Sequence, residues 1–181
     1  MYKIIDCNFH DRNNILKNIK TIDFDKCVYY DADVWFQDTI DELFDFEFEQ
    51  IKDIGYQIDF KEIKRVGCQW IDDILDHGMI LNPKDTKLIE TTVEYGTKMW
   101  LMSLNGEGEY CNPSVENIAK EVFLSMMVLF QPYKNLRISD VTIYETPNCS
   151  TICIKESISD AEAKNWMDNR YAEVLKYAQD K

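Results

Sequence analysis

The chain has 181 residues, of which 45% are hydrophobic and 13% aromatic, so it can bury one sizeable core as one domain, or two at most. Its 20 basic and 33 acidic residues give a net charge of −13, which opposes binding to nucleic acid because the phosphate backbone is also negative. No apolar run approaches the roughly 18 residues that span a bilayer, and no signal peptide opens the sequence, so we expect a soluble, cytoplasmic protein with reduced cysteines.

Strand-forming runs dominate the first third of the chain. Polar segments that resemble turns separate four such runs, at residues 2–7, 27–37, 43–50 and 55–58. If residues 27–37 form one extended strand, then Cys27, Asp31 and Asp33 share a face and the two carboxylates lie about 7 Å apart. Like charges at that spacing repel each other, so water or a bound cation must stabilise them.

The hydrophobic period then changes to that of helices. From residue 60 to residue 75, apolar residues recur at intervals of three and four, as on one face of an amphipathic helix. Asp59 and Glu62 form a capping box at its start, and Gly78 follows its last turn as a stop. A weaker helical pattern follows at residues 86–95 and a strand at residues 98–104.

The remaining elements are two helices and the hairpin between them. Ser114 can cap the first helix, whose buried stripe consists of Ile118, Val122, Met126 and Leu129. Strands at residues 137–145 and 150–155 form the hairpin, and a capping box of Ser159 and Glu162 opens the last helix. Helices that arrive between hairpins predict an α+β fold, in which an antiparallel β-sheet carries helices packed on one face.

Four stretches in this order carry a family pattern. They are GYQIDFKEIK at 55–64, LDHGMILNPKD at 75–85, NPSVENIAKEVF at 112–123 and VTIYETPNCSTICI at 141–154. Together they resemble the 6-pyruvoyl-tetrahydropterin synthase and 6-carboxytetrahydropterin synthase family. The resemblance implies a tunnelling fold for residues 1–156, with residues 157–181 as an appended C-terminal helix. Subunits of that fold assemble into an oligomeric barrel, usually a homohexamer with active sites between subunits.

The resemblance also implies a reaction. Members of the family are metal-dependent lyases that break carbon–oxygen and carbon–carbon bonds in 7,8-dihydroneopterin triphosphate. The bacterial branch makes 6-carboxytetrahydropterin for the queuosine and 7-deazaguanine pathway, and the other branch makes 6-pyruvoyltetrahydropterin. We therefore expect a small-molecule pterin triphosphate as the substrate.

Three residues match the pterin-binding part of the family pattern. Glu145 matches the glutamate that anchors the pterin, because a carboxylate can accept two parallel N–H bonds from a flat ring. Thr146 is expected to assist it, and Ser114 stands where the family has threonine or serine near the pterin. The alternatives are an exposed glutamate at a strand end and a serine that only caps its helix.

Proton transfer is implied for Cys27, Asp76 and His77. An imidazole titrates near neutrality, and a nearby carboxylate stabilises its charged form. Adjacent residues on a helix do not face each other, so Asp76 could instead orient a neighbouring group. The simpler interpretation of His77 is favourable placement at a helix C-terminus.

The family places zinc on three histidines, and two of those positions differ here. Where the family has Cys-x-x-x-His-Gly-His, this chain has Cys27 with Asp31 and Asp33, and His10 lies upstream as the remaining ligand. One imidazole and two carboxylates suit Fe(II), Mn(II) or Mg(II) better than three imidazoles do, although Zn(II) also fits. The alternative is that the metal has been lost and both aspartates face water.

The negative charge of the chain is difficult to reconcile with a triphosphate substrate. Lys61, Lys64 and Arg65 lie on the polar side of the first helix and could bind phosphate, but a solvated surface is the favoured interpretation. Two other functions therefore stay open: a pterin- or purine-binding protein without catalysis, and an acidic protein–protein inhibitor or decoy that binds a basic partner.

Overall fold

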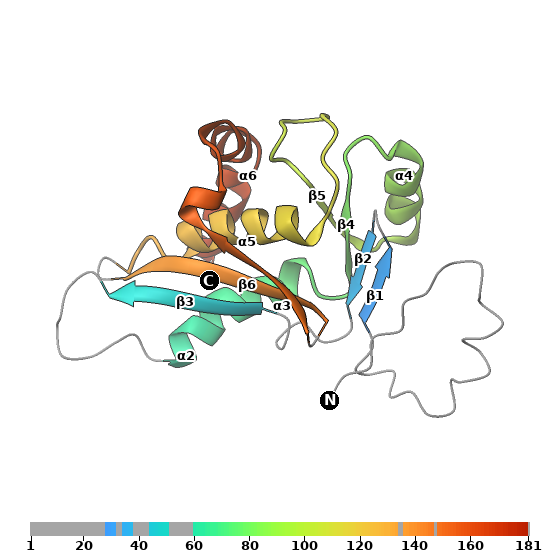
Figure 1. Cartoon of the computed structure of the whole chain (residues 1–181). Helices are drawn as coiled ribbons and strands as arrows, with labels where there is room; N and C mark the ends of the chain where they lie inside the picture. Colours follow the sequence, from blue (N-terminus) through green and yellow to red (C-terminus); the bar gives the residue numbers. More distant parts are fainter. Residues whose placement is uncertain are drawn as a thin grey trace, which may run out of the picture.

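The structure is a computed structural model that describes residues 28–31, 34–37, 44–50, 60–133, 136–146 and 148–180 (Figure 1). The strands expected at residues 2–7 and 55–58 and the Asp59 cap lie outside these residues. Within them, helices and antiparallel hairpins combine in the α+β class. None of the described helices is long and apolar enough to cross a membrane.

The strands form two sheets. One sheet has the order β1-β2-β4-β5, from β1 (Val28–Asp31), β2 (Val34–Gln37), β4 (Gly78–Leu81) and β5 (Lys98–Leu101). The other has the order β3-β6-β7, from β3 (Phe44–Gln50), β6 (Leu136–Thr146) and β7 (Cys149–Ile154), and it is antiparallel throughout.

Two expectations about the strands are wrong. Residues 28–31 and 34–37 are two antiparallel strands rather than parts of one strand, because Asp31 pairs with Val34. The expected alternation of Asp31 with Asp33 is not described, because Asp33 lies outside the described residues. The pairing is also not antiparallel everywhere, since β4 and β5 are parallel. The helix α4 (Thr86–Tyr95) supplies the crossover that a parallel pair needs.

The first predicted helix is a continuous helical stretch with an irregular centre. It consists of α2 (Phe60–Ile63), a π-helical segment (Lys64–Cys68) and α3 (Gln69–Ile74). Gly67 lies in the π-helical segment, where an added Cβ would lie 3.4 Å from Met126 Sδ and from the Phe130 ring. A glycine at this position therefore lets the segment pack closely against the next long helix.

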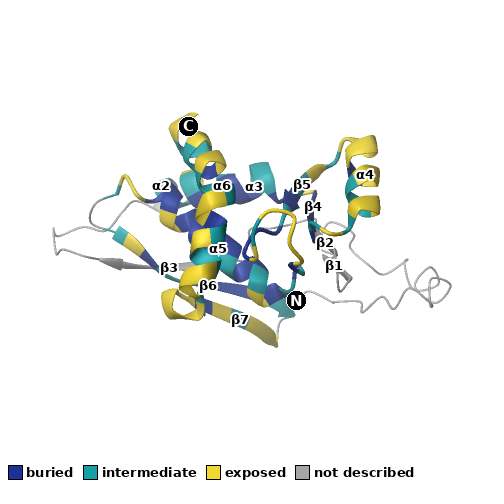
Figure 2. Cartoon of the chain, turned by 90° about the horizontal axis from the view of Figure 1, so that it is seen from above, coloured by how far each residue is buried: buried dark blue, intermediate teal, exposed yellow. Residues whose placement is uncertain are grey.

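That helix, α5 (Val115–Leu129), is the centre of the fold. It packs against β6 and β7 on one side and against α6 (Asp160–Asp180) on the other. Figure 1 shows these three layers as sheet, α5 and α6, and Figure 2 shows α6 lying over α5 with its outer side exposed. The predicted stripe of Ile118, Val122, Met126 and Leu129 is buried, and so are residues on the other sides of α5.

One of those other residues is Glu121, whose carboxylate is buried. Its Oε1 accepts hydrogen bonds from the Ser103 backbone N–H at 2.6 Å and the Ser103 hydroxyl at 3.1 Å. Its Oε2 accepts a hydrogen bond from Trp100 Nε1 at 3.2 Å. Removal from water raises the pKa of this carboxyl, and the hydrogen bonds offset only part of that effect.

The helix α6 is held to the core by polar contacts as well as by its buried Trp166 and Val174. Arg170 donates to the carbonyl oxygen of Leu101 at 2.6 Å, and its guanidinium lies 4.8 Å from the centre of the Trp100 ring. At the start of the helix, Glu162 accepts a hydrogen bond from the Ser159 backbone, which confirms the predicted capping box.

We expect the stability difference between E121Q and the wild type to depend on pH. Because burial raises the pKa of Glu121, the native state keeps this carboxyl protonated to a higher pH than the unfolded chain, whose glutamate has the ordinary pKa of 4.5. The free energy of unfolding of the wild type should therefore lose a contribution as pH rises from 4.5 toward the raised native pKa, and the variant should not. Urea unfolding at pH 5 and pH 8 should show E121Q gaining stability relative to the wild type.

The matched control for this experiment is E107Q. Glu107 is an exposed glutamate in a loop, so its replacement removes the same charge without changing the core. A stability difference between E121Q and the wild type that is the same at both pH values would contradict the prediction.

Candidate functional site

The predicted site residues fall into a described and an undescribed group. His10, Cys27 and Asp33 lie outside the described residues, and Asp31 is described only as the last backbone position of β1. Asp76, His77, Ser114, Glu145 and Thr146 are described with their side chains. They belong to two parts of the chain: the turn after α3, and the region where the β6–β7 hairpin approaches the start of α5.

Asp76 and His77 form a hydrogen-bonded pair. The imidazole Nδ1 lies 2.7 Å from Asp76 Oδ2, and the His77 side chain is 65% exposed whereas that of Asp76 is 26% exposed. The expectation that these neighbours do not face each other is wrong, because neither residue is helical. The helix α3 ends at Ile74, and His77 adopts a left-handed conformation with φ 53°.

The turn also corrects the expected role of Gly78. The helix stops where the sequence predicted, but the left-handed residue that follows it is His77 rather than a glycine. Gly78 is instead the first residue of β4, and an added Cβ there would lie 2.9 Å from the carbonyl oxygen of Leu75. The glycine is needed for space, and the histidine carries the unfavourable backbone conformation.

This arrangement suits a proton carrier. An ionised carboxylate can only accept hydrogen bonds, so Asp76 selects the imidazole tautomer that donates from Nδ1. In that tautomer Nε2 carries the lone pair that can take a proton. A left-handed conformation at a residue other than glycine costs on the order of 1 kcal/mol, and such strain is concentrated at functional sites.

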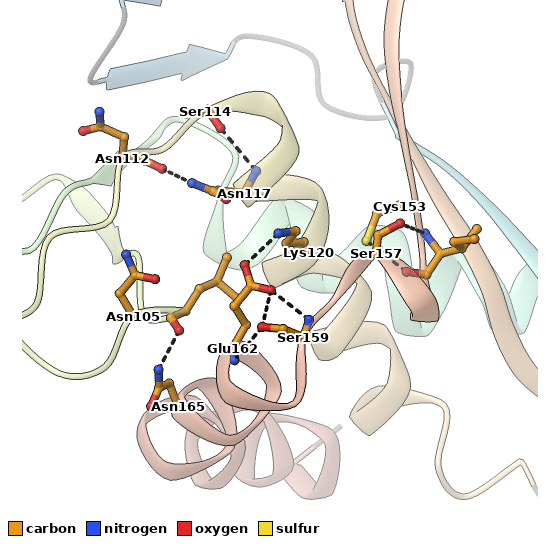
Figure 3. Close-up of polar contacts among 12 residues, drawn as sticks. Asn105, Asn112, Ser114, Asn117, Lys120, Cys153, Ser157, Ser159, Glu162 and Asn165 are labelled. Carbon is orange, nitrogen blue, oxygen red and sulfur yellow. Dashed lines mark hydrogen bonds and ion pairs between the residues drawn. The ribbon is translucent and has the colours of Figure 1, made fainter.

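The start of α5 is held by a chain of asparagines (Figure 3). Ser114 is the N-cap residue, and its hydroxyl accepts a hydrogen bond from the Asn117 backbone N–H at 3.4 Å. Asn117 Nδ2 donates to the carbonyl oxygen of Asn112 at 3.0 Å. The side chain of Asn112 in turn accepts from Asn82 Nδ2 at 2.9 Å. The end of β4 is thereby joined to the loop that precedes α5.

Asn82 and Asn112 were not predicted as site residues from the sequence, although both precede proline. Asn-Pro pairs are typical of turns, because the asparagine side chain bonds to backbone groups nearby and the proline fixes its own φ and restricts the residue before it. Asn82 is buried, and its Oδ1 accepts from the backbone N–H of Lys84 at 2.9 Å and of Cys111 at 3.4 Å. The two Asn-Pro pairs were the available signal for this connection.

The β6–β7 hairpin places Glu145 beside a thiol. Glu145 is half-buried, and its Oε2 accepts a hydrogen bond from Cys149 Sγ at 3.5 Å. This contact raises the pKa of the Cys149 thiol, and the charge of Glu116 in the first turn of α5 acts in the same direction. The Glu145 end of the hairpin therefore lies near the N-terminus of α5. The Thr146 hydroxyl accepts from the Asn148 backbone N–H at 3.2 Å, so it stabilises the turn.

Among the described side chains, no group of three or more His, Cys, Asp or Glu residues is arranged to hold a metal ion. The expected donors His10 and Asp33 and the carboxylate of Asp31 are not among those side chains. The described residues of the predicted site therefore form two separate groups, the exposed His77 imidazole with its Asp76 partner after α3, and Glu145 with Cys149 at the end of the β6–β7 hairpin. These groups can transfer a proton and accept N–H donors.

Comparisons with family models and with curated proteins agree on one family. A family model described as 6-pyruvoyl tetrahydropterin synthase matches residues 42–156, which include all five described site residues. The helix α6 follows this segment, and the expected metal donors and Cys27 precede it. No solved structure gives a significant match.

Curated relatives come from Rickettsia and are named 6-carboxy-5,6,7,8-tetrahydropterin synthase. The protein from Rickettsia felis is 36% identical over 103 residues, that from Rickettsia conorii is 34% identical over 103 residues, and that from Rickettsia typhi is 32% identical over 101 residues. Each alignment covers 53% of this chain, and the chain spans 65% of the length of each relative.

We expect H77G to be more stable than H77A by about 1 kcal/mol, because glycine adopts φ 53° without the steric cost that alanine has there. Both variants remove the imidazole and its contact with Asp76, so the difference isolates the backbone. Urea unfolding of the two variants measures it. Equal stability, or a more stable H77A, would mean that residue 77 is not left-handed in solution.

Proposed function

The chain belongs to the 6-pyruvoyl tetrahydropterin synthase family, and from this premise we propose that it is a lyase that acts on 7,8-dihydroneopterin triphosphate. Within the family we propose activity of the 6-carboxytetrahydropterin synthase type, which is the name that the Rickettsia relatives carry. The product would then enter the queuosine and 7-deazaguanine pathway. Cytoplasmic location and homo-oligomeric assembly, as a hexamer, are part of the same proposal.

The observation that carries the proposal is the position of Glu145. Its carboxylate lies at the end of β6 near the first turn of α5, within the segment that matches the family. A half-buried carboxylate can accept two parallel N–H bonds from the amino group and ring nitrogen of a pterin. We propose that Glu145 orients the pterin in this way, with Thr146 holding the hairpin turn and Ser114 holding the helix start beside it.

His77 is proposed to move protons along the substrate side chain. Asp76 orients its imidazole and stabilises the positive charge that forms when Nε2 takes up a proton. Exposure of the imidazole is consistent with a site that is completed by a second subunit. Cys27 is proposed as the second proton-transferring group, since its position relative to Asp31 and Asp33 follows the family spacing.

The proposed metal donors are His10, Asp31 and Asp33. One imidazole and two carboxylates form a donor set that fits a divalent cation such as Fe(II), Mn(II), Mg(II) or Zn(II). When bound, such an ion polarises the oxygen atoms of the substrate side chain and so acidifies the neighbouring carbon. The two carboxylates would lower its Lewis acidity relative to a site of three histidines.

Of the basic residues considered for the triphosphate, Arg65 is already engaged. Its guanidinium forms an ion pair with Glu62 at 2.8 Å and lies 3.4 Å from the Tyr133 hydroxyl. Glu62 also accepts a hydrogen bond from that hydroxyl at 2.8 Å. Lys61 and Lys64 are therefore better candidates than Arg65 for binding phosphate from this helical stretch.

The test is incubation of the purified chain with 7,8-dihydroneopterin triphosphate and added zinc, iron or manganese. We expect metal-dependent release of triphosphate, and a loss of about 100-fold in kcat/KM for E145Q because a bidentate acceptor is lost. The exposed-loop variant E107Q should keep wild-type turnover. No release of triphosphate with any of the three metals would refute the lyase, and pterin binding without turnover would support the non-catalytic alternative.

A further inference from the structure

Lys98 is the first residue of β5 and reaches back to the turn that carries the Asp76–His77 pair. Its ammonium donates to the carbonyl oxygen of Asp72, in the last turn of α3, at 2.8 Å. It also donates to the carbonyl oxygen of Asp76 at 2.8 Å. One side chain thus satisfies two carbonyl groups at a helix end, where cations interact favourably with the helix dipole.

The contact with Asp76 has a specific geometric consequence. The carbonyl of Asp76 belongs to the peptide plane that joins Asp76 to His77, and φ of His77 is the rotation about the bond that leaves this plane. A hydrogen bond that holds this carbonyl therefore limits the rotation that places the imidazole. The hydrogen bond from Lys98 to the Asp76 carbonyl thus helps to maintain the unfavourable φ of 53° at His77.

The parallel sheet explains why Lys98 is in reach. In the β4–β5 register Gly78 is the partner of Lys98, so the lysine starts directly beside the turn. A Cβ on Gly78 would lie 3.3 Å from Lys98 Cβ. The glycine allows the close approach of the two strands that brings the ammonium to the end of α3.

We propose that Lys98 is a positioning residue for the proton-transferring pair. It holds the Asp76–His77 peptide so that the imidazole Nδ1 meets the Asp76 carboxylate and Nε2 is turned toward the substrate. Lys98 does not touch the reacting atoms in this proposal. The catalytic part of the inference rests on the proposed function of His77, whereas the placement of the imidazole does not.

The test uses K98M, which keeps the apolar stem of the side chain and removes the donors. K98Q, whose side chain is one atom shorter, provides a second variant without the reach of lysine. K98R should restore the two hydrogen bonds, since a guanidinium also donates to several acceptors. The matched control is K87M, which removes an equal charge from the exposed surface of α4.

The first measurement is independent of catalysis. The chain contains two histidines, so the imidazole resonances of His77 can be assigned in NMR spectra by their loss in H77N. We expect K98M and K98Q to shift or broaden the His77 resonances, and K98R and K87M to leave them as in the wild type. Unchanged His77 resonances in folded K98M and K98Q would overturn the inference, whatever the activity.

The second measurement is turnover of 7,8-dihydroneopterin triphosphate. We expect kcat of K98M to fall by about 10- to 100-fold, because a small misplacement of a reacting group is enough for a loss of this size. KM should change by less than about threefold, because pterin binding is assigned to Glu145, and K98R should recover most of kcat. Wild-type kcat in K98M would overturn the catalytic part. Absence of turnover in the wild type, with displaced His77 resonances in K98M, would refute the proposed function but support the placement.

Discussion

The buried carboxyl group of Glu121 links the central helix α5 to strand β5 and the residues that follow it. It connects α5 to Trp100 of β5 and to Ser103 just after that strand, and it is buried. A buried carboxyl without these donors would destabilise the fold by a few kcal/mol, so its hydrogen bonds fix one register of α5 against β5. Arg170 of α6 lies over Trp100 and covers this contact from outside. The turn with His77 depends on that register, since β5 begins beside it, and the hairpin with Glu145 lies against the same helix, because β6 and β7 pack on α5.

The two described parts of the candidate site differ in character: hydrogen bonds hold the start of α5, whereas the turn after α3 is strained. Asparagine side chains and the Ser114 cap hold the start of α5, and the cap satisfies a backbone N–H of the first helical turn. The turn after α3 has the opposite character, because His77 adopts a backbone conformation that costs free energy. Stability of the rest of the fold compensates for that cost. A proton carrier gains from such a turn, since its imidazole faces a fixed carboxylate while the ring stays accessible.

Several features whose cause lies within a few residues were predicted correctly. The Ser114 and Ser159 caps act on groups three residues away, and the β6–β7 hairpin forms between neighbouring segments, so each was predicted close to its observed place. Two local features were also predicted wrongly, because a turn was not recognised. Residues 28–31 and 34–37 are paired strands rather than one strand, and Asp76 faces His77 because the helix has already ended. Glu121 could not be recognised as buried from its helix alone, because α6 covers the side of α5 that would otherwise face water.

The sequence by itself determined the α+β class, the helix starts and the four motifs that identify the family, because short-range hydrogen bonding and residue order carry that information. Only the tertiary structure decided the parallel pairing of β4 with β5, the left-handed conformation of His77 and the contact of Lys98 with the end of α3. The physical reason is that these features exist only when residues far apart in sequence are packed together. A lysine twenty-two positions from Asp76 can hold its carbonyl only after the two strands have paired.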